Sequence, residues 1–185
     1  MNKVVRRYTT QMEVLQAIRD RLIDAVPGYT HANCFILDQP IPPDFPIGRE
    51  CCTIAPGGGA FVDAMFAGAG YRVVTENATT LVTPMVRQVR DAPRTASKAL
   101  LDQRDGLLQR KWDILRALLW DDFDLSIDDE DAALTRLLLR EQLSVRDAQT
   151  PGFVQIGQSQ MMGLTMTFNT PFDWGLLPPE GFGIA

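Results

Sequence analysis

The stretch from Leu100 to Trp120, LLDQRDGLLQRKWDILRALLW, constrains the fold of this chain more than any other segment. It predicts an amphipathic helix with two neighbouring rows of large apolar side chains and a charged back. The rows are Leu101, Leu108, Trp112, Leu115 and Leu119, and beside them Leu100, Leu107, Ile114 and Leu118. The charged back, which we expect to face outward or toward a neighbour, includes Arg104, Arg110, Lys111 and Arg116. Because so wide an apolar face must be covered, the other elements are expected to pack on it.

An N-terminal helix is predicted from Thr10 to Val26. Thr10 and Glu13 have the spacing of a capping box, in which a hydroxyl and a carboxylate satisfy orphan backbone amides. Apolar residues follow at helical spacing, and Pro27-Gly28 ends the pattern.

Short apolar runs bounded by turn residues predict strands. These runs are 33–37, 49–55, 71–76, 81–89 and 153–156. Asn77 is expected to turn the chain between two of them, and Pro84 indicates an edge or a bulge. The four prolines within Asp38–Gly48 predict a stiff connector, whereas Ala60–Gly70 fits either helical turns or a strand.

The clearest strand pattern runs from Met162 to Asn169. Apolar residues alternate there with Gly163, Thr165 and Thr167, which predicts one buried face and one open face. Pro171 is expected to end the strand, and residues 175–185 are expected to form a loose tail or a segment that contacts a partner.

The acidic segment after Trp120 could be a metal site or the start of a helix. An EF-hand is excluded, because counting from Asp122 places Ile127 at the glycine position and Ala133 at the glutamate position. We therefore expect Ser126 to cap a helix from Ile127 to Leu143, with acids near its N-terminus.

Length and composition narrow the class of protein. The 185 residues predict a single domain, 1–185, with a sizeable core, and no run of about 18 apolar residues predicts a membrane span. The N-terminus also lacks the apolar region of a secretion signal, and three cysteines fit free thiols in a reducing cytosol. A net charge of −5 disfavours a broad grip on nucleic acid.

No motif in the chain indicates catalysis or a cofactor. There is no GxSxG elbow, and His31 is the only histidine available to a nucleophile or a metal. The glycines at 57–59 are not followed by the lysine of a phosphate-binding loop. We therefore expect no catalytic residues, no cofactor and no metal.

Two segments carry a family resemblance: Asp102–Leu108 with Lys111–Leu115, and Met166–Phe168 with Phe172–Leu176. With the order of predicted elements, they make the chain similar to the tail terminator or tail-completion proteins of tailed bacteriophages. The resemblance implies an α+β two-layer sandwich, with helices packed on one face of a mainly antiparallel sheet. It also implies a ring, usually a hexamer, that caps the tail tube, ends tube polymerisation and joins the tail to the head or neck.

The resemblance further implies the location and the partners. The protein would be assembled in the host cytoplasm and lie in the virion at the junction of tail and neck. It would contact itself, the tail tube protein and neck or connector proteins, and genomic DNA would pass without sequence readout. The proline-rich loop and the segment after Trp120 depart from a minimal terminator, so another head–tail connector of similar fold is an alternative.

Several residues are candidates for contact with partners, because aromatic and arginine side chains dominate interface energetics. The candidates are Phe61, Met65, Phe66, Arg87, Arg90, Arg94, Thr165, Thr167, Phe172 and Trp174. Core packing is the alternative for each aromatic residue, and a solvated positive edge is the alternative for the arginines. A small α+β enzyme, a ligand-binding domain and a nucleic-acid adaptor that uses the three arginines also stay open.

Overall fold

One long strand, β4 (Arg72–Arg87), organises the fold. The structure is a computed structural model that describes residues 10–40, 48–66, 72–87, 100–102, 106–120, 126–129, 134–137 and 143–176. In it, β4 is 16 residues long and forms hydrogen-bonded ladders with four other strands. One side of β4 pairs with β2 (Glu50–Pro56) and β3 (Ala60–Phe66). The other side pairs with β9 (Ser159–Gly163) and β10 (Met166–Leu176). All four pairings are antiparallel.

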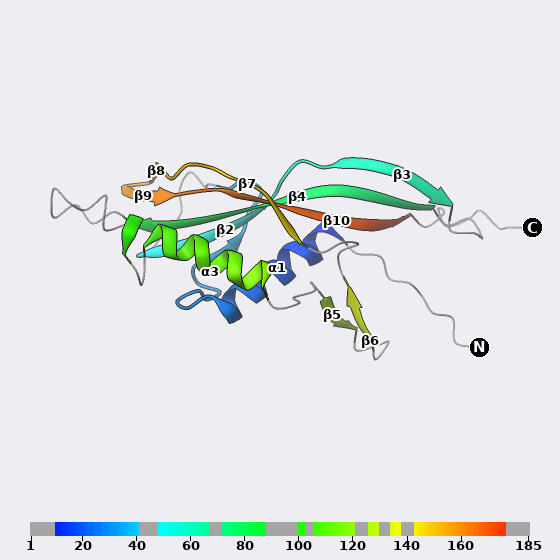
Figure 1. Cartoon of the computed structure of the whole chain (residues 1–185), viewed down its shortest axis with the longest axis horizontal. Helices are drawn as coiled ribbons and strands as arrows, with labels where there is room; N and C mark the ends of the chain where they lie inside the picture. The colour runs from blue at the N-terminus through cyan, green and yellow to red at the C-terminus, as the bar shows by residue number, and fades with distance from the viewer. Residues whose placement is uncertain are drawn as a thin grey trace, which may run out of the picture.

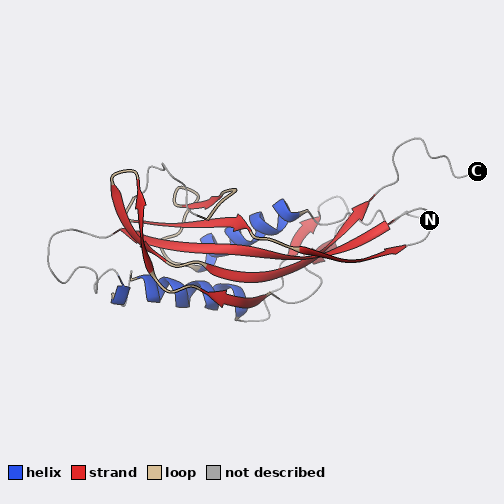
Figure 2. Cartoon of the chain, turned by 90° about the horizontal axis from the view of Figure 1, so that it is seen from above, coloured by secondary structure: helices blue, strands red, loops and turns tan. Residues whose placement is uncertain are grey.

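Three further strands complete the eight-stranded sheet (Figures 1 and 2). β1 (Cys34–Ile36) lies parallel to β2, β7 (Ser144–Ala148) extends the sheet beyond β10, and β8 (Gly152–Ile156) forms a hairpin with β9. The β1–β2 pair is the one parallel pair among the described strands.

Two helices in the described part of the chain cover one face of this sheet (Figure 1). α1 (Gln11–Ala25) and α3 (Leu107–Leu119) pack on each other, α1 also packs on β1 and β2, and α3 packs on β4. The predicted α+β class, with helices on one face of a mainly antiparallel sheet, is confirmed.

The capping box of α1 is confirmed atom by atom. The Thr10 amide donates to the Glu13 carboxylate at 2.7 Å, and the Glu13 amide donates to the Thr10 hydroxyl at 3.3 Å. The main core lies between these helices and the sheet, where Ile18, Leu118 and Phe168 are among the fully buried side chains. A smaller apolar cluster of Cys51, Met85, Ile156 and Met161 packs separately.

The predicted turn at Asn77 is wrong. β4 runs straight through it, because Asn77 pairs with Ala60 on one side and Pro171 on the other, so two ladders hold the backbone extended. The prediction that Pro84 marks an edge or a bulge is also wrong, since Pro84 lies in this central strand. The Pro84 carbonyl accepts a hydrogen bond from the Leu164 amide, so the Pro84 nitrogen also points to this side of β4. Because β10 has ended there and β9 has not yet begun, the missing N–H of the proline removes no ladder hydrogen bond.

The predicted strand Met162–Asn169 is two strands, since Leu164 and Thr165 separate β9 from β10. Pro171 does not end β10, which continues to Leu176. The proline is tolerated because its nitrogen faces away from β4, on the side where pairing with β7 stops at Asn169. Gly175 and Leu176 therefore belong to the sheet rather than to a tail, and residues 177–185 lie outside the described residues.

The predicted helix from Ile127 to Leu143 is also wrong. Residues 126–129 and 134–137 form the strands β5 (Ser126–Asp129) and β6 (Leu134–Leu137) instead, and these strands pair with each other. A short apolar run such as Leu-Thr-Arg-Leu fits both helical and strand periods, and cross-strand pairing decides the outcome here.

The predicted helix from Leu100 to Trp120 is interrupted, because Leu100 and Leu101 are helical but α3 begins only at Leu107. Gly106 precedes it, and a Cβ atom there would lie 2.5 Å from the Asp102 backbone, so only glycine fits this turn. Most other predicted elements are confirmed: the first helix and the strands at 33–37, 49–55 and 153–156. The described part of the ambiguous segment Ala60–Gly70 is strand β3, whereas residues 67–70 and residues 41–47 of the connector lie outside the described residues.

Candidate functional site

Only half of the broad apolar face of α3 is covered. Leu107, Ile114 and Leu118 of one row are fully buried, but most of the other row faces outward. Leu108, Trp112 and Leu119 are exposed, with Trp112 at 57%. We call Leu108, Trp112 and Leu119 the outer face of α3, whereas Leu115 of the same row is half-buried and packs against the main core. A helix whose apolar face is wider than the core covers has apolar surface left for a partner, and the sequence prediction missed this because it expected one broad face to be covered within the chain.

Arg110 does not lie on an outward charged back, as the sequence predicted. Its side chain is 4% exposed and makes a forked ion pair with Glu50 on β2, with Nε to Oε2 at 2.7 Å and Nη2 to Oε1 at 3.2 Å. Asp113 adds a longer contact at 3.4 Å. The pair therefore fixes the rotation of α3 and sets which apolar row faces outward.

The loop after α1 completes this buried polar cluster. Gly28 has φ +88°, and a Cβ atom there would lie 2.7 Å from the Glu50 Oε1 atom. The Tyr29 ring lies under the Arg110 guanidinium, 5.7 Å from centroid to Cζ, which is within cation–π range. The glycine thus gives the carboxylate and the guanidinium room to meet.

Burial shifts the ionisation of the groups around this cluster. It raises the pKa of the Tyr29 hydroxyl, raises the pKa of Cys52, and raises the pKa of Cys51 to about 12. The bonds to Glu50 raise the pKa of Arg110 in spite of its burial, so its charge is retained. All three cysteines are free and buried, as expected for small apolar residues.

These shifts predict that the protein loses stability in alkali. Because Cys51 holds its proton to a higher pH when folded than when unfolded, its contribution is complete below pH 9 and falls as the pH rises toward 12. A shift of that size corresponds to a loss of at most about 4 kcal/mol in the free energy of unfolding. Urea unfolding of the reduced protein at pH 8 and pH 11 measures it.

Cys51→Ala should make the loss between pH 8 and pH 11 visibly smaller. Ile156→Val is the matched control, because it perturbs the same apolar cluster without removing a titrating group. An equal loss of stability in both variants would show that Cys51 does not contribute to the pH dependence.

A second exposed apolar surface lies on β3. Ala60, Phe61 and Val62 are all exposed, with Phe61 at 69%, although successive side chains point to opposite faces of the strand. Among the described strands β3 bonds only β4, so its outer edge has no described partner. An apolar edge strand of this kind is a template for contact with another chain.

The predicted interface residues do not form one surface. Phe61 is exposed on β3, and Arg87 is exposed at the far end of β4, roughly 35 Å along the sheet. Phe172 is fully buried in the main core, and Thr165 is buried with its hydroxyl 3.0 Å from that of Thr83, so neither is the open contact that was expected. Thr167 is half-buried.

The remaining predicted interface residues are only partly described. Met65, Phe66 and Trp174 lie on strands β3 and β10, but their side chains fall outside the described residues, as do Arg90 and Arg94 entirely. His31 is exposed. The two segments that carry the family resemblance map in part onto α3 and β10.

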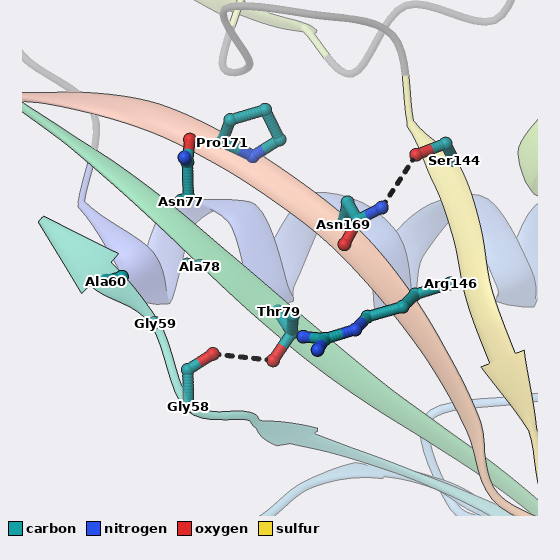
Figure 3. Close-up of a pocket in the computed structure, with 10 residues that line it drawn as sticks. All are labelled: Gly58, Gly59, Ala60, Asn77, Ala78, Thr79, Ser144, Arg146, Asn169 and Pro171. Atoms are coloured by element: carbon teal, nitrogen blue, oxygen red, sulfur yellow. Dashed lines mark hydrogen bonds between the residues drawn. The ribbon is translucent and has the colours of Figure 1, made fainter. Parts of the chain in front are cut away.

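An open polar hollow of about 700 Å³ lies on the sheet face away from the helices (Figure 3). Arg146 extends from β7 across β10 toward Thr79 on β4. The Thr79 hydroxyl donates to the Gly58 carbonyl at 2.7 Å, and the Asn169 amide donates to the Ser144 hydroxyl at 3.0 Å. Gly57 and Gly59 allow the rim to lie close to β4, because Cβ atoms there would collide with Thr79 and Glu76.

The polar side chains that line this hollow are hydroxyl and amide groups and one arginine. The ten described residues that line it include no carboxylate, histidine, cysteine or lysine, so none of them supplies a general base to the Thr79 or Ser144 hydroxyl. The groups with shifted pKa values lie around Glu50 and not in the hollow. An arginine with hydroxyl and amide groups suits a polar or anionic ligand, which keeps a ligand-binding role open.

In the described part of the chain, no three acidic, cysteine or histidine side chains cluster as a metal site would require. Neither α1 nor α3 has the length and apolar character of a membrane-crossing helix. Comparison with protein-family models and with curated protein sequences found no match to this chain.

Proposed function

We propose that this chain is a structural virion protein, a tail terminator that assembles into a ring, caps the phage tail tube and joins the tail to the head or neck. The observation that carries the proposal is the pair of exposed apolar surfaces, the outer face of α3 and the edge of β3. Large exposed apolar patches mark surfaces that another protein covers.

The resemblance of the two sequence segments supplies the more specific assignment. The α+β arrangement, with helices on one face of a mainly antiparallel sheet, is the one that the resemblance implied. On this proposal the partners are other copies of the chain, in a ring of about six, the tail tube protein and a neck protein. Genomic DNA passes through the ring without sequence readout, and the mature location is the tail–neck junction of the virion.

A binding experiment with tail tubes tests the proposal. Purified protein should form a closed ring by native mass spectrometry, and electron microscopy should show it at one end of tubes made from the cognate tail tube protein. When present during polymerisation, it should also limit tube length. A strict monomer with no affinity for tubes would refute the proposal.

A neck or connector protein of similar fold is the second candidate. It is favoured by the strands β5 and β6, which form their own two-stranded sheet beside the main one and could serve a further contact. Rings that bind a head connector, but leave tube ends bare, would select it.

A further inference from the structure

The outer face of α3 is apolar with a basic border. Arg116 is exposed and Lys111 half-buried beside Leu108, Trp112 and Leu119. Asp113, the one acid in α3, is bound to Arg110 inside the molecule. A partner that covers this face would therefore present apolar side chains with carboxylates around them.

The exposed edge of β3 combines exposed apolar side chains with acidic residues on the strands that pair there. Phe61 pairs in register with Glu76 on β4, and Glu76 pairs with Phe172 on β10. The paired stretch of β3, β4 and β10 carries three acids, Asp63, Glu76 and Asp173, against one base, Arg72. Apolar side chains at an acidic end of the sheet thus complement an apolar helix face with a basic border.

The two surfaces lie at opposite ends of the molecule. Figures 1 and 2 show β3 and the paired ends of β4 and β10 extending past the helices, whereas α3 lies under the other end of the sheet. One chain cannot bring them together without unfolding, but two chains can. A contact between two different surfaces of the same chain repeats head to tail, and it closes into a ring when the rotation fits.

We propose that the outer face of α3 in one copy docks on the β3 edge, Ala60–Val62, of the next copy. This inference rests on the proposed ring-forming function and names the surfaces that join its subunits. Trp112 and Phe61 are the central residues of the contact, and Lys111 and Arg116 face the acidic end of the neighbouring sheet.

Cross-linking of single-cysteine variants tests the pairing directly. The native cysteines are buried at 2% exposure or less, so a bismaleimide reagent should react with an introduced surface cysteine first. Trp112→Cys and Phe61→Cys, carrying tags of different mass, should each stay uncoupled alone and should form a mixed dimer when combined. Phe153→Cys, at an exposed position on β8, replaces Phe61→Cys as the matched control and should give no mixed dimer.

A substitution measures the contribution of the contact to assembly. Trp112→Ser should weaken association at least about tenfold in sedimentation or native mass spectrometry, as expected for a buried aromatic anchor. Phe153→Ser should leave association unchanged. Both side chains are more than half exposed in the single chain, so circular dichroism should show that both variants fold.

The outcomes separate this inference from the proposed function. Self-coupling of Trp112→Cys alone would indicate a symmetric contact and overturn the inference. A ring that persists with Trp112→Ser and without mixed cross-links would also overturn it while leaving the ring-forming function intact. A wild-type chain that stays monomeric and ignores tail tubes would overturn both.

Discussion

Arg110→Met is expected to lower the free energy of unfolding by about 3–5 kcal/mol, because it leaves the Glu50 carboxylate without its partner in the interior. The Glu50 side chain is only 17% exposed, so water replaces the lost guanidinium poorly. The same change frees α3 to rotate, since the forked pair joins that helix to β2. Urea unfolding at pH 7 with reduced thiols measures the effect.

Two controls locate the origin of this loss. Arg19→Met breaks an ion pair with Asp20 whose side chains are 28% and 56% exposed, and it should cost about 0–1 kcal/mol. The double variant Arg110→Met with Glu50→Gln should recover much of the stability, since no unpaired charge is left buried. If Arg110→Met costs no more than Arg19→Met, the pair does not hold α3 in place.

Phe172→Ala is expected to cost about 3–5 kcal/mol, because it leaves a cavity where a fully buried ring packs in the main core. Phe61→Ala is the matched control, because Phe61 lies across β4 from Phe172 and pairs with the same residue, Glu76. The Phe61 ring is exposed, so in the monomer its loss should change stability by only about 0.5 kcal/mol. Thermal or chemical unfolding under conditions that keep the chain monomeric gives both values.

In assembly the order of the two effects should be reversed, so that the Phe61 substitution has the larger effect. Phe61→Ala should weaken association between copies, whereas any folded fraction of Phe172→Ala should associate normally. A mild effect of Phe172→Ala on stability, with a strong effect on association, would restore Phe172 as an interface residue and contradict its buried position.

Local signals predicted the elements that depend on local interactions. The capping box of α1 needs only Thr10 and Glu13, three residues apart, and both of its bonds are present. The strand β1 was predictable because turn residues bound a short apolar run. The opposite directions of Cys51 and Cys52 follow from strand geometry alone, and the two residues do pack in different clusters.

Features set by distant pairing were not predictable in this way. Asn77 is a turn former, but ladders to Ala60 and Pro171 hold it extended, and neither partner can be identified from its neighbours in sequence. Arg110 was assigned outward because it is charged. Its spacing from Leu107 and Ile114 places it on the buried row, so the signal was present, but the burial needs Glu50 from another strand.

Which residues of the candidate surfaces are exposed could not be predicted from the sequence either. Phe61 and Phe172 carry the same side chain and both pair with Glu76 of β4 at one end of the sheet, yet one is exposed and the other buried. Their difference depends on which strand lies against the main core, to which Phe172 belongs, and this is a property of the assembled fold rather than of either segment. The exposure of Trp112 likewise follows from the rotation of α3 that the Arg110–Glu50 pair fixes.

The position of β4 between early and late strands has a consequence for folding during synthesis. β2, β3 and β4 lie within residues 50–87 and can pair as soon as they are made, but β10 completes the other side of β4 only after residue 176. The hydrogen bond between the Thr80 and Thr170 hydroxyls, for example, joins two residues that lie 90 positions apart in the sequence. Such long-range pairing slows folding, and unfinished sheets expose apolar surface that promotes aggregation. The incomplete chain therefore offers an open edge of β4 to other nascent copies, and timely release of the last strands decides whether it assembles or aggregates.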